Sequence, residues 1–99
     1  MKVEKTEYFD KWLKKLKDMR AQRTINAHID RMIDGNFGKI RFVGDGVYEK
    51  KINYGAGFRL YYVQRGDAWI LLICGGDKST QQKDIQLAQE IKKGLSWPK

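Results

Sequence analysis

The sequence contains one cysteine, one proline and one histidine, and it has no long apolar segment. Because Cys74 has no partner, no intramolecular disulfide can form, which excludes the class of small secreted domains held together by disulfides. The longest apolar run, residues 68–74, is much shorter than the roughly 20 residues that a membrane-spanning helix needs. Residues 1–12 carry charges where a signal peptide would have an apolar segment. We therefore expect a cytoplasmic protein with no membrane partner.

The spacings that are typical of metal sites are absent as well. The chain has no C-x-x-C, no H-E-x-x-H and no pair of histidines, and its single histidine, His28, falls in a segment with helical spacing. Structural and catalytic zinc sites need such groups of ligands. We expect no metal and no cofactor, and we expect His28 to be a surface helix residue rather than a catalytic one.

Positive charge is in excess. The sequence has 20 Lys and Arg residues against 12 Asp and Glu residues, which gives a formal net charge of +8 and a pI near 9.7. Such a balance attracts polyanions, and RNA, DNA, an acidic protein or an anionic membrane would each satisfy it. The first predicted helix carries a group of lysines: Lys11, Lys14, Lys15 and Lys17. We expect each of them, taken singly, to be a solvated surface residue and the group as a whole to steer a nucleic acid electrostatically.

The length of 99 residues predicts a single domain, residues 1–99. Hydrophobic spacing predicts the order β-α-α-β-β-β-α, an α+β fold. The predicted strands are residues 2–6, 47–54, 58–63 and 68–74. The predicted helices are residues 7–20, a second that stops at residues 35–36, and a third that a Ser79–Gln82 capping box opens and Gly94 ends. Residues 35–46 are predicted to form a loop, and residues 95–99 a frayed tail.

Alternation along the strands predicts which side chains share a face of the sheet. Glu49 and Lys51 fall on a polar face, which we expect to be open to solvent. Arg59 and Tyr61 of the next strand are predicted to lie on that same face. Lys50 is predicted to point to the opposite face.

Arg59 is the leading candidate for chemistry at this face. A guanidinium on a strand can grip two phosphate oxygens and stabilise the charge that develops as the phosphorus is attacked. The alternative is a solvated arginine paired with Glu49. Lys51, one strand earlier, can bind a phosphate or balance local charge. Glu49 can act as a general base toward a ribose 2′-hydroxyl or form a salt bridge that positions Arg59, and the second role is the commoner one.

Two further groups extend the candidate site. Lys78 follows Gly75-Gly76-Asp77 just before the last helix, where a cation and backbone N–H groups can converge on an anion. The alternative there is a plain strand-to-helix turn in which Asp77 complements the helix dipole. Tyr54, Tyr61 and Trp69 could stack on unpaired bases, although aromatic residues of a small sheet more often fill its core.

The strings FDKWLKKLKD, GNFGKIRFVGDGVYEKKINYGAGFRLYYVQRGD and LLICGGDKSTQQKDIQLAQEI, taken in order, resemble a known family. The chain is similar to the phage-derived Gp49-like, HigB-like branch of the RelE/ParE toxin superfamily, the addiction-module killer proteins. The resemblance extends from Tyr8 to Ile91. It depends on three elements in order: Gly-Asp-Gly, Gly-x-Gly-Phe-Arg and Gly-Gly-Asp-Lys.

This resemblance implies two N-terminal helices packed on an antiparallel sheet, with a C-terminal helix. It implies the toxin of a type II toxin–antitoxin system that arrests growth by cutting mRNA in the ribosomal A site without a metal. The catalytic residues are then expected to be Glu49, Lys51, Arg59 and Lys78. We add as RNA contacts Lys50, Tyr61 and Asp77. The implied partners are the ribosome, mRNA and an antitoxin encoded next door, which carries a DNA-binding domain and links the toxin to operator DNA.

The chain also departs from the family pattern. Where RelE-like enzymes often have a Tyr or His near the end of the sheet or in the last helix, this sequence has Asp77 and Asp84. The general acid for the 5′-oxygen is therefore unassigned, and Lys78 is the candidate. The same fold serves ParE-like proteins that poison DNA gyrase, and a member that only binds its antitoxin is a third possibility. Fold alone cannot choose among them, because function lies in the site.

Overall fold

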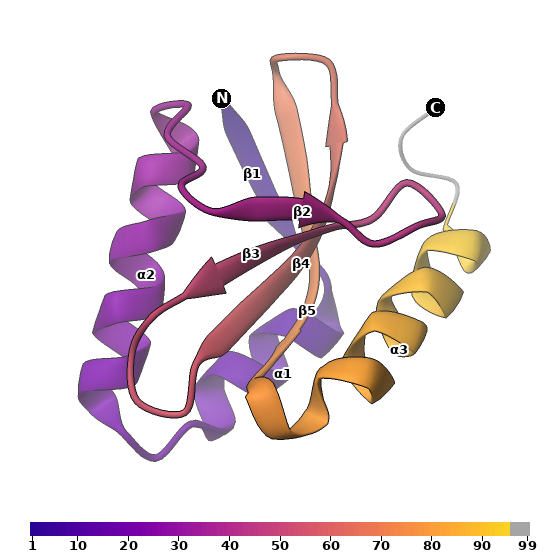
Figure 1. Cartoon of the computed structure of the whole chain (residues 1–99). Helices are drawn as coiled ribbons and strands as arrows, with labels where there is room; N and C mark the ends of the chain where they lie inside the picture. The colour runs from indigo at the N-terminus through magenta and orange to yellow at the C-terminus, as the bar shows by residue number, and fades with distance from the viewer. Residues whose placement is uncertain (96–99) are drawn as a thin grey trace.

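The computed structural model describes residues 1–95. In chain order, the elements are β1 (Lys2–Lys5), α1 (Glu7–Lys15), α2 (Met19–Ile33), β2 (Ile40–Phe42), β3 (Tyr48–Ile52), β4 (Phe58–Arg65), β5 (Trp69–Gly76), a 3-10 turn (Lys78–Thr80) and α3 (Gln81–Gly94). This arrangement confirms the predicted α+β class (Figure 1). Of the predicted tail, residues 96–99 lie outside the described part of the chain.

The five strands form one mixed sheet in the order β1-β5-β4-β3-β2. Strands β2 to β5 pair antiparallel, whereas β1 pairs with β5 in parallel. The expectation of a wholly antiparallel sheet is therefore wrong. The reason lies in β5, which is buried on both faces and has a neighbour on each side, as its continuous apolar sequence requires. The first strand supplies the second neighbour.

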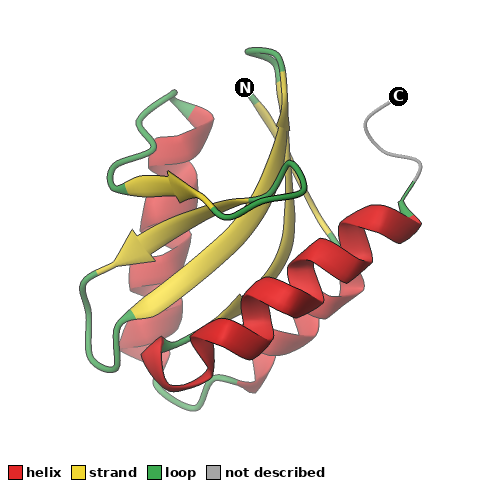
Figure 2. Ribbon diagram, turned by 45° about the vertical axis from the view of Figure 1, so that its right-hand side comes forward, coloured by secondary structure: helices red, strands yellow, loops and turns green. Residues whose placement is uncertain are grey.

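Helices cover both faces of this sheet (Figures 1 and 2). On one face α1 and α2 enclose a core that includes Phe9, Ile25, Met32, Leu60 and Leu72. On the other face α3 encloses a smaller core that includes Val63, Ile73, Ile85 and Ala88. The sheet is thus the middle of three layers, and the face that carries Arg59 lies toward α3.

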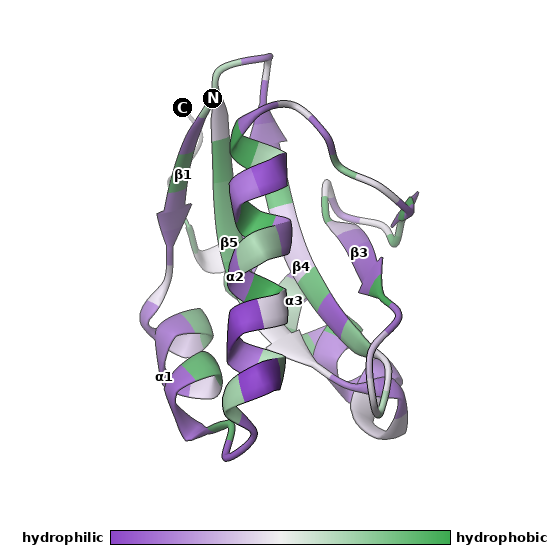
Figure 3. Ribbon diagram, turned by 90° about the vertical axis from the view of Figure 1, so that its left-hand side faces the viewer, coloured by the Kyte–Doolittle hydropathy of each residue, from purple (hydrophilic) through white to green (hydrophobic). Residues whose placement is uncertain are grey.

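The boundary between the first two helices differs from the prediction. Helix α1 ends at Lys15 rather than at Arg20, and α2 begins at Met19. Asp18 causes the break, because its Oδ1 accepts hydrogen bonds from the backbone N–H groups of Arg20 and Ala21 and so caps α2. The buried apolar residues of α2 recur every three or four positions and pack toward the sheet. Figure 3 shows hydrophobic and hydrophilic residues alternating along this helix.

Strand β2 lies inside the predicted loop 35–46. It has only three residues, all of them exposed, so no alternation of buried and exposed positions marks it in the sequence. It pairs antiparallel with β3, with Arg41 opposite Glu49. This short edge strand supplies part of the candidate site.

None of the helices within residues 1–95 is long and apolar enough to cross a bilayer.

Candidate functional site

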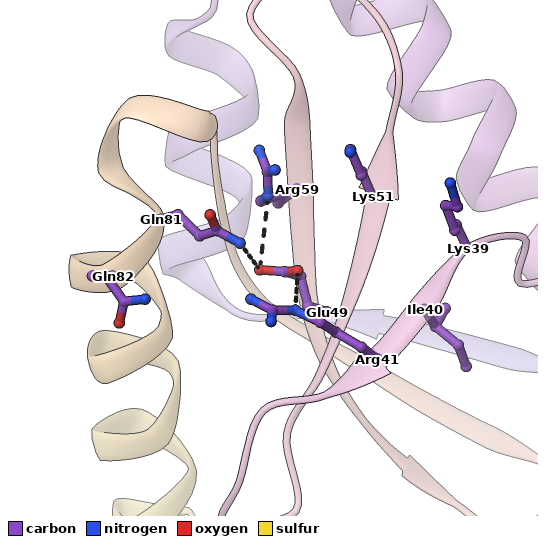
Figure 4. A pocket seen from close by; sticks show the side chains of 8 residues that line it. All are labelled: Lys39, Ile40, Arg41, Glu49, Lys51, Arg59, Gln81 and Gln82. Carbon is purple, nitrogen blue, oxygen red and sulfur yellow. Dashed lines mark hydrogen bonds and ion pairs between the residues drawn. The ribbon is translucent and has the colours of Figure 1, made fainter.

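Two rows of side chains run across the strands on the face toward α3. In the first row, Lys51 lies directly opposite Arg59, and the backbone N–H of Lys51 donates to the carbonyl of Lys39 at 3.0 Å. We name Lys39, Lys51 and Arg59 the cation row. The second row holds Arg41, Glu49 and Tyr61, which are cross-strand partners in the same order. Figure 4 shows the side chains of the cation row extending to the same side.

The second row is charge-balanced around a buried carboxylate. Glu49 is 4% exposed. Its Oε1 accepts a hydrogen bond from Arg41 Nε at 2.8 Å, and its Oε2 accepts from the Tyr61 hydroxyl at 3.1 Å and from Gln81 Nε2 at 3.0 Å. We name these four residues the Glu49 cluster. Its members come from β2, β3, β4 and the first residue of α3, so one carboxylate holds four elements together.

These hydrogen bonds decide the ionisation of Glu49. Burial alone would raise the pKa of the carboxyl, but the hydrogen bonds from Arg41, Gln81 and Tyr61 outweigh it and hold the pKa below its usual value. The carboxylate is therefore ionised and already occupied by donors. This geometry favours the alternative in which Glu49 positions its neighbours over the one in which it acts as a general base.

Arg59 lies in the wall of the site rather than on an open surface. It is 6% exposed, its Nη1 donates to the carbonyl of Gly57 at 2.8 Å, and its Nε lies 3.8 Å from Glu49 Oε2. The expectation of a solvent-exposed face is wrong here, because α3 covers this part of the sheet. The buried Nε has no hydrogen-bond partner within residues 1–95. The guanidinium is thus fixed in place and keeps unused donors.

A pocket of about 540 Å³ opens between the two rows and the start of α3. It is lined by Lys39, Ile40, Arg41, Glu49, Lys51, Arg59, Gln81 and Gln82. Four of these side chains are cationic and one is anionic. The anion is shared by Arg41 and Arg59, and no other acid lines the pocket, so its positive charges exceed its negative charge. Like charges placed side by side on a sheet repel one another, and a bound anion relieves that repulsion.

Lys78 extends the cation row at its Arg59 end. A Cβ built on Gly57 would lie 3.5 Å from Arg59 Nη1 and 3.8 Å from Lys78 Cβ, so the two cationic residues flank the same glycine. The backbone N–H of Lys78 also donates to the carbonyl of Ala56 at 3.4 Å. Lys78 is exposed and does not line the pocket itself. Lys51 is thus the cross-strand partner of Arg59, and Lys78 lies beside Arg59 across Gly57.

Asp77 has a structural position. Its Oδ1 accepts hydrogen bonds from the backbone N–H of Ser79 at 2.8 Å and from the Ser79 hydroxyl at 2.5 Å, so Asp77 caps the turn that precedes α3. The predicted Ser79–Gln82 capping box is wrong, because the residue before α3 is Thr80, which makes no capping bond. As an RNA contact, Asp77 stays a prediction that this geometry does not support.

Tyr61 does not lie on an open face. It is fully buried, and its hydroxyl donates to Glu49. Burial and then the Glu49 charge raise the pKa of this hydroxyl. A ring with no exposed surface cannot stack on a base without a rearrangement. Of the other two aromatic candidates, Tyr54 stacks on Phe58, and Trp69 lies under the Lys2 ammonium, 4.5 Å from the ring centre.

Lys50 points to the opposite face, as predicted, but it is also buried. Only 2% of it is exposed, and its Nζ donates to the carbonyl of Phe37 at 2.7 Å. Burial, and then the charge of Arg31, lower the pKa of the ammonium. Lys50 therefore cannot contact a ligand in the pocket that Arg59 lines.

Sequence reasoning missed three residues of the site. Lys39 and Arg41 fall in the segment that was predicted to be a loop, and Gln81 falls at the start of the last helix. A signal for Arg41 exists, since Ile40, Arg41 and Phe42 form an apolar-charged-apolar triplet, but three residues are too few to identify a strand. Within residues 1–95 no three His, Cys, Asp or Glu side chains cluster in a way that could hold a metal ion.

No protein-family model matches the chain. A relative occurs in Haemophilus influenzae, where it is described as an uncharacterized protein. The two sequences are 47% identical over 95 residues, which cover 92% of this chain and 96% of the relative. The similarity therefore extends over most of the chain.

Proposed function

This chain belongs to the same family as that Haemophilus influenzae protein, and we propose that it is the toxin of a type II toxin–antitoxin pair. In this proposal the protein is a RelE/ParE-like, metal-independent and ribosome-dependent mRNA endoribonuclease of the cytoplasm. It stops translation and growth until its antitoxin, which carries a DNA-binding domain, covers the site. Through that antitoxin the toxin would also reach operator DNA.

One observation carries this proposal, namely the cation row beside a buried and already neutralised carboxylate. Lys39 and Lys51 are exposed, whereas Arg59 is fixed between Gly57 and Glu49. A phosphodiester needs such an arrangement, since mobile cations attract the backbone and a fixed guanidinium selects one phosphate geometry. The preorganised donor costs little to align when charge develops in the transition state.

The proposed reaction assigns these residues the following roles. The ribose 2′-oxygen attacks the adjacent phosphorus, the bond from that oxygen to phosphorus forms, and the bond from phosphorus to the 5′-oxygen breaks. Arg59 and Lys51 stabilise the added negative charge on the phosphate oxygens. The 2′-hydroxyl proton passes to solvent water, and the Lys78 ammonium gives a proton to the departing 5′-oxygen. Lys78 is exposed and regains its proton from water. Glu49 acts as a positioning residue for Arg59 and Arg41.

Induced expression of the wild-type chain and of Arg59→Ala tests the proposal. Messenger RNA ends are mapped in translating and in non-translating lysates. We expect new ends with the wild type only where ribosomes translate, and at least a 100-fold loss with Arg59→Ala. The matched control is Arg65→Ala, which changes an exposed arginine on the same strand and should cut like the wild type.

Two outcomes would contradict the proposal. Intact messages in both lysates together with accumulated cleaved DNA–gyrase complexes would assign the chain to the gyrase poisons instead. Intact messages with no growth arrest would leave antitoxin binding as its activity.

A further inference from the structure

A second pocket, of about 360 Å³, lies where the α2–β2 connection meets the end of β3. It is lined by His28, Arg31, Asn36, Gly38, Lys39, Lys50, Lys51 and Asn53. Four of these residues are cationic and none is acidic. The proposal above uses Lys39 and Lys51 among them, so His28, Arg31 and Lys50 have no assigned role.

Lys50 places a buried ammonium group at this pocket. The residue is almost fully buried, and among residues 1–95 one of the three N–H donors of its ammonium is paired, with the Phe37 carbonyl. Gly38 leaves space beside the ammonium, because a Cβ at position 38 would lie 2.9 Å from Nζ. Placing a charged lysine in the interior is costly unless a partner compensates the charge. No carboxylate does so among the residues that line the pocket.

His28 adds an unpaired polar atom to the same place. Its Nδ1 is buried without a hydrogen-bond partner within the described chain, which is unusual for a folded protein. Burial, Lys50 and Arg31 all lower the pKa of the imidazole, so a neutral ring lies among cations. A phosphate oxygen would accept hydrogen bonds from the cations and from an imidazole N–H.

The two pockets adjoin at two shared lining residues. Lys39 and Lys51 line both of them. A single strand can therefore pass from Arg59, over the exposed ends of these two lysines, to Arg31 and His28. Lys39 and Lys51 would contact the RNA strand between a phosphate at Arg59 and a phosphate in the second pocket.

We propose that the second pocket binds an additional phosphate of the same RNA strand whose scissile phosphate lies at Arg59. This subsite rests on the proposed function. It adds to that function the requirement that the RNA substrate extend beyond one dinucleotide step. The group that it recognises is a phosphate within an RNA chain, held by Arg31, Lys50 and His28.

The single histidine makes a direct test possible. The proton resonances of the His28 ring are followed by NMR during titration with inorganic phosphate, with a 2′-O-methyl dinucleotide and with a 2′-O-methyl tetranucleotide, neither of which can be cleaved at the 2′-oxygen. Affinities are measured in parallel for Arg31→Gln, for Arg41→Gln, and for the control Arg23→Gln, which changes an exposed arginine of the same helix outside the pocket.

We expect the tetranucleotide to shift the His28 signals and to bind Arg31→Gln about tenfold more weakly than the wild type, as the loss of one charge-assisted contact predicts. The dependence of its affinity on salt should fall by about one ion in that variant. The dinucleotide should bind Arg31→Gln and Arg23→Gln as it binds the wild type, and of the three variants only Arg41→Gln should weaken it, because Arg41 lines the first pocket.

Other results would overturn the subsite. Suppose that Arg41→Gln weakens tetranucleotide binding, that the His28 signals do not shift and that Arg31→Gln binds like the wild type. The subsite is then refuted while the proposed function survives. If inorganic phosphate binds at His28 as tightly as the tetranucleotide does, the pocket recognises a free anion and not a strand. If neither oligonucleotide binds, both proposals fail together.

Discussion

At Glu49 a single carboxylate is held by Arg41 from β2, Tyr61 from β4 and Gln81 from α3. Such a buried ion gains stability only because each lone pair is matched by a donor, and removal of the charge leaves Arg41 and Arg59 facing each other uncompensated. The residue that sets the geometry of the site is therefore also one that the fold depends on. Changes at Glu49 should alter stability and cleavage together.

Replacement of Glu49 by Gln keeps the volume and removes the charge. We expect the free energy of unfolding at pH 7 to fall by about 2 kcal/mol, the cost of losing charge-assisted hydrogen bonds in a buried site. The pKa of Glu49 is lowered by folding, so its contribution is fully present above the unfolded pKa of roughly 4.3 and is lost as the pH falls through the folded value. The difference between wild type and variant should thus be constant from pH 5 to 7 and shrink in more acidic solution.

Urea unfolding across this pH range measures the effect, and Glu90→Gln, an exposed position on α3, is the matched control. A difference that grew on acidification would show that Glu49 is protonated in the folded protein. The pH profile of cleavage separates the two roles of the carboxylate. If Glu49 positions its neighbours, Glu49→Gln cuts more slowly at every pH. If Glu49 is the general base, the decrease in rate at acidic pH that the wild type shows is absent from the variant.

Among the elements, the end of β5 sets how closely the helices approach the sheet. The sequence predicts that Gly75 and Gly76 terminate the strand, but both belong to it. A Cβ on Gly75 would overlap the indole ring of Trp12 in α1, and a Cβ on Gly76 would overlap the carboxylate of Asp84 in α3. The glycine pair therefore allows one helix on each face to pack against the last two residues of β5. The approach of α3 in turn brings Gln81 to Glu49.

Gly75→Ala should therefore be destabilising although it changes no polar contact. Since the added methyl group must displace a packed indole ring, we expect a loss of about 1–3 kcal/mol. Gly94→Ala is the control, because no atom lies within 4 Å of a Cβ there and the site is the last residue of α3. Thermal unfolding compares the two variants. Equal melting temperatures would mean that α1 can move away from β5 without cost.

The elements also show what the sequence could and could not predict. Alternation placed Phe58, Leu60 and Tyr62 on one face of β4 and Arg59, Tyr61 and Val63 on the other, and the two cores confirm this division. The solvent exposure of the second face could not be predicted from alternation. The sequence alternates in the same way whether the charged face of a strand is exposed to solvent or is covered by other elements that pair with its charges.

The candidate site shows the same limit. Arg59, Lys51 and Lys78 could be found because each belongs to a recognisable strand or turn. Arg41 and Gln81 could not, since they contribute through β2, which is too short to be recognised, and through the docking of α3, which depends on tertiary packing. Tyr61 was placed on the correct face and given the wrong surroundings for the same reason.

Over the whole molecule, two separate groups of lysines and arginines contribute to the net charge of +8. The cation row lies on the side of the sheet toward α3, whereas Lys11, Lys14 and Lys15 project from α1 on the other side, followed by Lys17. The α1 lysines line neither of the two pockets, so they can act on RNA bound there only through a long-range field, which salt screens over about 8 Å at physiological ionic strength. The two groups should therefore influence RNA binding in different ways.

Simultaneous replacement of Lys11, Lys14, Lys15 and Lys17 by Gln should leave RNA association nearly unchanged at 0.15 M salt. At 0.01 M salt, where the Debye length is about 30 Å, the same variant should associate several-fold more slowly, because the distant charges then contribute to steering. Lys39→Gln, by contrast, removes a contact at the site and should speed dissociation at both salt concentrations. Stopped-flow binding of a fluorescent 2′-O-methyl tetranucleotide resolves the two rates. A large loss of association in the fourfold variant at 0.15 M salt would mean that RNA contacts α1 directly and that the binding surface extends beyond the cation row.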